Sequence, residues 1–213
     1  ISLLNTLTSN VLNAYENYDI TTAGRLIQDF TGDHLSNWYV RLNRKRFWRG
    51  DLDEDKRAAY QTLYTCLRTI ALLGAPIAPV YMERLYLDLG AGDSVHLELM
   101  PPVRKELIDK ALEERMDLAQ RCTSMVLALR RKVNIKVRQP LSKILMPVLD
   151  KSMEKKLAKV KSIILNEVNV KELEFIHDTA GFILKGIKPN FKVLGKKCGP
   201  RMKEIASALN DFS

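Results

Sequence analysis

The chain has 213 residues, of which 46% are hydrophobic, and carries a formal net charge of +9. This composition is typical of a folded protein, and the charge favours a polyanionic partner, because each phosphate that a cation neutralises releases condensed counterions. No run of about 20 apolar residues occurs and the first residues lack the order of a signal peptide, which argues against a membrane protein and favours a cytoplasmic one.

The first ninety residues are predicted to form four helices. Apolar residues recur at three- and four-residue steps over residues 1–17, and a second stripe of this kind runs from Ala23 into the forties. The acidic residues 53–55 suit the start of a third helix, and Pro79 suits the first turn of a fourth. Short connections between four helices predict an antiparallel bundle, to which we assign residues 1–90.

Residues 37–49, the basic aromatic segment, combine aromatic rings with cations and contain no acid. Both tryptophans of the chain lie here, Trp38 and Trp48. Exposed rings stack on unpaired bases, while cations hold phosphates. If the helix continues to Trp48, both rings share one face with Arg41 and Lys45. The candidate RNA-binding residues of this segment are Trp38, Arg41, Arg44, Lys45, Arg46, Trp48 and Arg49.

A structural role for the same residues is an equally good interpretation. Trp38 and Tyr39 fit the apolar stripe of the predicted helix and can belong to the core, with the cations forming a solvated face. The segment alone does not decide between one stacking tryptophan and two.

A connector and a long helix follow. Glycines and prolines between residues 91 and 103 predict the connector. Residues 104–139 are predicted to form the helix, with an apolar stripe from Ile108 to Val133 and a basic C-terminal end. Cations stabilise a helix C-terminus through its dipole, which accounts for part of this cluster but does not require five cations, so these residues are also candidates for binding RNA phosphates. Its members are Arg130, Arg131, Lys132, Lys136 and Arg138.

Residues 140–213 are predicted to form a small mixed α+β subdomain. A short apolar run at 144–149, a helical stripe from Met153 to Val168 and a partly alternating segment at 170–176 indicate strand, helix and strand. A further strand at 182–187 and a helix at 200–209 complete a β-α-β-β-α order. The predicted fold class is therefore mainly α.

A third basic cluster lies near the C-terminal end. Between Asp178 and Glu204 there are seven cations and no acid. A lysine-rich loop of this kind can contact RNA or merely increase solubility. Its candidate RNA-binding residues are Lys192, Lys196 and Lys197.

Residues typical of catalysis or metal binding are scattered. The cysteines Cys66, Cys122 and Cys198 lie more than fifty residues apart, and none pairs in sequence with a histidine. We expect reduced thiols, with Cys66 in a core, and no metal site. Neither GxGxxG nor GxxxxGK[ST] occurs, so the residues themselves indicate a binding module with no cofactor of its own.

Several stretches resemble a known family. Phe30 to Trp48 reads FTGDHLSNWYVRLNRKRFW and is similar to isoleucyl-tRNA synthetases of class I, as are LLGAPIAPVYMERLY from Leu72, SMVLALRRKVNIKVRQPLSKI from Ser124 and NEVNVKELEFI from Asn166. The resemblance covers nearly the whole chain. The AP-x-AP turn is shared with the valyl, leucyl and methionyl enzymes, whereas NWYVRLNRKRFW and KVRQPLSKI favour the isoleucine family.

This resemblance implies a C-terminal region that binds the anticodon arm of an isoleucine-accepting tRNA. The family's catalytic motifs and its editing domain are missing here, so ATP and Mg²⁺ would act in a catalytic domain elsewhere in the same chain. Because the sequence begins at Ile1 without an initiator Met, we expect a non-catalytic fragment of a monomeric ligase. The alternatives are the same region of a valyl, leucyl or methionyl enzyme, or a free-standing basic helical RNA-binding protein.

Overall fold

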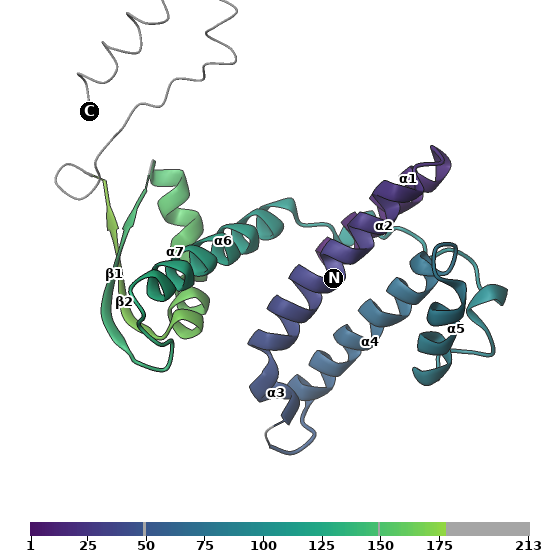
Figure 1. The fold of residues 1–213 in the computed structure, drawn as a ribbon, viewed down its shortest axis with the longest axis horizontal. Helices are drawn as coiled ribbons and strands as arrows, with labels where there is room; N and C mark the ends of the chain where they lie inside the picture. Colours follow the sequence, from purple (N-terminus) through teal and green to yellow (C-terminus); the bar gives the residue numbers. More distant parts are fainter. Residues whose placement is uncertain (49, 149, 178–213) are drawn as a thin grey trace, which may run out of the picture.

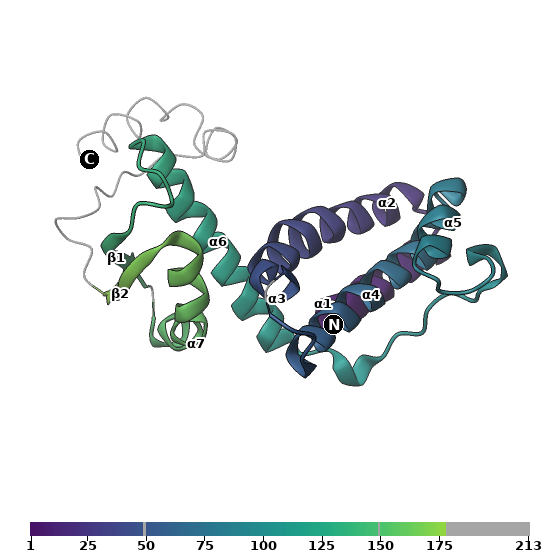
Figure 2. The same ribbon diagram turned by 90° about the horizontal axis from the view of Figure 1, so that it is seen from below.

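The computed structural model describes residues 1–48, 50–148 and 150–177. Within these ranges the chain is mainly helical, with seven α-helices and one parallel sheet of two strands. Figures 1 and 2 show a larger N-terminal lobe of helices and a smaller C-terminal lobe containing the sheet, with one long helix extending between them.

The predicted long second helix is divided in the structure. The chain enters through α1 (Ser2–Glu16) and α2 (Ile20–Asp29), continues as a π-helix, η1 (Phe30–Val40), and turns before the short α3 (Arg44–Trp48). In a π-helix each N–H bonds to the carbonyl five residues earlier, so its side chains depart from the 3.6-residue phase. The condition that one α-helix continues to Trp48, on which the shared face of the two tryptophans depended, is therefore not met.

The next two helices begin where their capping residues predict. The Asp53 carboxylate accepts a hydrogen bond of 2.7 Å from the Lys56 backbone N–H and caps α4 (Glu54–Gly74), while Pro79 occupies the first position of α5 (Pro79–Asp88). The apolar faces of α1, α2, η1 and α4 form one core, which includes Val11, Ala23, Cys66 and Leu73.

The long helix α6 (Lys110–Lys132) begins later than residue 104, because Asp109 caps it and a single 3₁₀ turn, η3 (Lys105–Leu107), precedes it. An earlier 3₁₀ turn, η2 (Val95–Leu97), lies in the connector. Only the middle of the predicted stripe is buried, at Ala119 and Cys122. Leu129 and Val133 are 63% and 62% exposed, whereas Arg130 in the same turn is 3% exposed, so the covered face at this end of the helix is not the predicted stripe.

The C-terminal lobe is a β-α-β unit made of β1 (Leu141–Pro147), α7 (Lys151–Val168) and β2 (Val170–Ile176). The strands pair in parallel, from Leu141 opposite Val170 to Pro147 opposite Ile176. Buried residues of α7 pack with Ala119 and Cys122 of α6 in a second core. The two predicted strands and the helix between them are confirmed, whereas the predicted strand at 182–187 and helix at 200–209 lie outside the described residues.

Several contacts from η1 and the residues after it join the N-terminal helices to α6 and the C-terminal lobe. Trp38 of η1 packs against the C-terminal core, and the Gln120 side chain of α6 donates a hydrogen bond of 3.1 Å to the Asp33 carbonyl. Arg41 forms an ion pair with Glu167 at the end of α7. Over the ranges described above, no helix is long and apolar enough to cross a membrane.

Candidate nucleic-acid interface

A groove of about 870 Å³ lies between α3 and the junction of α7 with β2. The basic aromatic segment contributes Arg41, Arg44, Lys45 and Trp48 to its lining. The opposite side includes Asn169, the residue between helix and strand. Residues more than a hundred positions apart in sequence therefore meet here.

The two tryptophans occupy different environments. The Trp48 side chain is 68% exposed, and the Arg44 guanidinium lies 5.8 Å from its ring centroid. Beneath it, Phe47 is buried against Tyr60, with ring centroids 5.1 Å apart. Trp38 is half-buried against the C-terminal core, and its Nε1 has no hydrogen-bond partner among the described residues. The predicted common face of both rings is absent, because η1 and the turn after it separate them.

Two of the predicted phosphate-binding cations are already paired with carboxylates. Arg41 binds Glu167, and Arg46 binds Asp55 through bonds of 2.6 and 2.7 Å. The hydrogen bonds to Asp55 raise the pKa of Arg46. Arg44 and Lys45 are exposed and form no ion pair within the described part of the chain, so they remain available to a phosphate. Arg49 lies outside the described residues.

Arg130 has a structural role, which corrects its assignment as a phosphate ligand. Its side chain is 3% exposed. The guanidinium donates hydrogen bonds of 3.1 Å each to the carbonyls of Lys136, Gln139 and Asn169. These contacts use the donors that a phosphate would need.

The remaining basic residues of this cluster are exposed at the end of α6 and on the turn that Arg130 holds. They are Arg131, Lys132, Lys136 and Arg138, which we call the basic turn. Its Val137 carbonyl accepts a bond of 2.9 Å from the Asn169 side chain. Because Asn169 also lines the groove, the basic turn and α3 lie at one surface.

Asn169 is the organising residue that the sequence reading missed. Its backbone is left-handed, with φ 53° and ψ 58°, a conformation that ends α7 and that asparagine tolerates better than most residues. An asparagine directly between a helical stripe and an alternating strand was the available signal. The lysines at 192, 196 and 197 lie outside the described residues.

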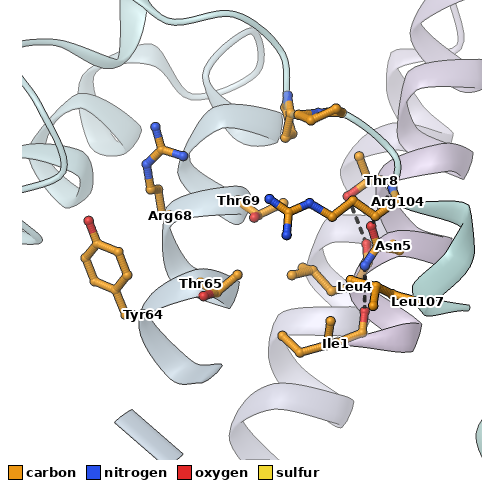
Figure 3. Close-up of a pocket in the computed structure, with 12 residues that line it drawn as sticks. Ile1, Leu4, Asn5, Thr8, Tyr64, Thr65, Arg68, Thr69, Arg104 and Leu107 are labelled. Carbon is orange, nitrogen blue, oxygen red and sulfur yellow. Dashed lines mark hydrogen bonds between the residues drawn. The ribbon is translucent and has the colours of Figure 1, made fainter. Parts of the chain in front are cut away.

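A second hollow, of about 300 Å³, lies between α1, α4 and the connector. Figure 3 shows Arg104 extending toward Thr69, and Asn5 accepts a bond of 2.9 Å from the Arg104 backbone N–H. Arg68 is held 3.4 Å from Glu98 and over the Tyr86 ring. This hollow shares no lining residue with the groove, and its polar contacts attach the connector to the helices.

The described cysteines are core residues, as predicted for Cys66. Cys66 and Cys122 are each 3% exposed, and burial raises the pKa of both thiols. A protonated, enclosed thiol is a poor nucleophile. No group of three or more His, Cys, Asp or Glu side chains able to hold a metal occurs over the residues that the structure describes.

An exposed tryptophan beside unpaired cations is typical of a module that binds nucleic acid. Comparison with known proteins supplies the family: residues 1–145 match the anticodon-binding domain of tRNA ligases. Over its full length the chain is 54% identical to isoleucine–tRNA ligases of Cytophaga hutchinsonii and Bacteroides thetaiotaomicron, and 41% identical to that of Clostridium novyi. The chain covers 20%, 19% and 20% of the length of these three relatives, respectively.

The chain belongs to the anticodon-binding domain family of tRNA ligases. The predicted resemblance to the C-terminal region of isoleucyl-tRNA synthetases is confirmed. Since the chain spans only about a fifth of these relatives, it corresponds to one portion of a ligase.

Replacing Arg130 tests its structural role. Arg130→Ala removes three hydrogen bonds from a charged donor and a side chain that is 3% exposed, so the free energy of unfolding should fall by about 2–4 kcal/mol. Arg131→Ala, an exposed neighbour with the same loss of charge, should change it by less than about 0.5 kcal/mol. Urea unfolding of both variants measures the difference, and equal losses would contradict the assignment.

Proposed function

We propose that this chain binds the anticodon arm of an isoleucine-accepting tRNA through the groove and the basic turn. The observation that carries the proposal is the convergence of exposed Trp48, Arg44 and Lys45 with the basic turn around Asn169. An exposed ring suits the unpaired bases of a loop, and the surrounding cations suit its phosphates.

The residues divide into two roles in this proposal. Trp48 stacks on an unpaired base with Arg44 beside it, and Lys45 with the basic turn holds phosphates. Arg41 and Arg46 position the segment through Glu167 and Asp55, while Trp38 joins the lobes. Arg49, Lys192, Lys196 and Lys197 stay in the proposed interface on the strength of their sequence alone.

The proposed setting is a monomeric cytoplasmic isoleucine–tRNA ligase. Its catalytic domain would use ATP and Mg²⁺ to attach isoleucine, and a separate domain would edit errors; this portion would hold the tRNA. In this proposal residues 1–90 form an antiparallel anticodon-binding bundle, 91–103 a connector, 104–139 a long basic helix and 140–213 a β-α-β-β-α subdomain.

Filter binding against a panel of tRNAs tests the proposal. The 213-residue chain should bind isoleucine tRNA more tightly than valine, leucine or methionine tRNA. If Arg44, Lys45 and the four cations of the basic turn each neutralise one phosphate, the log–log salt slope should be about −4, at roughly −0.7 per contact. A slope near zero would contradict the proposal, and equal affinity for all four tRNAs would favour a general RNA-binding protein.

The two tryptophans provide a matched pair of variants. Trp48→Ala should weaken tRNA binding by about 1–3 kcal/mol with an unchanged melting temperature, because an exposed stacking ring is lost. Trp38→Ala should lower the free energy of unfolding by about 2–3 kcal/mol, because apolar contacts between the lobes are lost. Calorimetry and filter binding separate these effects, and unchanged affinity in Trp48→Ala would rule out stacking.

A further inference from the structure

A hollow lined by cations, separate from the groove and from the hollow at the connector, lies between α6 and the N-terminal end of α7. Its volume is about 310 Å³. The lining contains no carboxylate and consists of Arg115, Lys151, Ser152, Lys155, Lys156 and Lys159. None of these residues belongs to the groove or the basic turn.

The periodicity of α7 creates this hollow. Leu157, Val160 and Ile164 are buried against α6 and the sheet, which turns the opposite face of α7 outward. Lysines at positions 151, 155 and 159 repeat every four residues and therefore form one row along that face. Arg115 of α6 completes the hollow from the side.

Four of the five cations have no carboxylate partner within the described residues. Lys156 is the exception, since its Nζ lies 2.6 Å from Glu114. The nearby acids are otherwise engaged: Asp150 accepts a bond of 2.7 Å from the Met153 N–H, and Glu154 lies 3.2 Å from His177.

The lysine row concentrates positive charge on one face of α7, while Asp150 at its N-cap and Glu154 in its first turn supply negative charge at its N-terminal end. Like charges four residues apart repel one another, and Lys151 in the first turn faces the positive end of the helix dipole. An anion held in the hollow relieves both effects. The local charge is therefore complementary to a phosphate.

The hollow and the groove lie toward opposite ends of α7. Lys151 and Lys155 occupy its first turns, whereas Asn169 follows its last residue. At 1.5 Å per residue the two sites are about 20 Å apart along the helix. Figures 1 and 2 show α7 as one continuous helix lying against α6. One polyanion can contact both sites, but one nucleotide cannot.

We propose that this hollow binds the phosphodiester backbone of the same RNA, away from the unpaired loop held in the groove. The inference rests on the proposed function, because the RNA can reach this hollow only if its loop is bound in the groove at the other end of α7. RNA is favoured over an acidic peptide because a nucleic acid backbone supplies regularly spaced anions over the required length.

The test compares two double variants with the same loss of charge. Lys151→Gln with Lys155→Gln removes two cations of the hollow. Arg25→Gln with Lys105→Gln is the control, since both residues are exposed outside the C-terminal lobe and neither lines the hollow or the groove. Each variant is titrated with full-length isoleucine tRNA and with a single-stranded RNA of the anticodon-loop sequence.

The hollow variant should bind full-length tRNA about tenfold more weakly at 0.1 M salt, with a salt slope shallower by roughly 1.4–1.8, as expected for two lost phosphate contacts. Its affinity for the short RNA should be unchanged, because that RNA does not reach the hollow. The melting temperature should stay the same or rise, since the repulsion between Lys151 and Lys155 is gone, together with an unfavourable first-turn cation at Lys151.

Three outcomes would overturn the inference. Equal losses of tRNA affinity in the two double variants would indicate an effect of net charge alone. An equal loss of affinity for both RNAs in the hollow variant would indicate that no second site exists. Either result leaves the proposed function intact if the wild-type chain still prefers isoleucine tRNA. Absence of tRNA binding by the wild-type chain would contradict both the proposed function and this inference.

Discussion

The Arg130 guanidinium donates its hydrogen bonds to carbonyls of the basic turn and of the α7–β2 junction. Burying a guanidinium is costly unless it is hydrogen-bonded, and here both terminal nitrogens of Arg130 have carbonyl partners, while its Nε has none among the described residues. Asn169 then donates to Val137 and accepts from the Leu141 N–H. The proposed interface depends on this small network, because it places the basic turn beside the groove.

The topology explains why these segments meet. In a parallel pair, both strands begin at the same edge of the sheet. The residues that precede β1 are the basic turn, and the residue that precedes β2 is Asn169. Arg41, paired with Glu167, connects that edge to α3 and so to Trp48. Elements assigned to separate predicted domains therefore share one surface.

Local signals predicted much of the fold and less of the site. Asp53 and Pro79 marked helix starts, and apolar spacing identified α1 and α7, because caps and amphipathic stripes depend on nearby residues. The π-helix was not predictable from such signals, since the 3.6-residue stripe appeared to continue. Arg130 and Arg131 are adjacent arginines that the sequence does not distinguish, and only the fold shows that Arg130 is buried and Arg131 is exposed. The pairing of Arg41 with a glutamate 126 positions away was equally hidden.

Cross-linking would test most directly the claim that α3 and the basic turn act as one RNA-binding surface. A benzophenone side chain is placed at position 48 or at position 137, where Trp48 and Val137 are exposed, and each protein is irradiated with isoleucine tRNA. Both proteins should label nucleotides of the anticodon arm. Labels in different arms of the tRNA, or labelling from only one of the two positions, would contradict a shared surface.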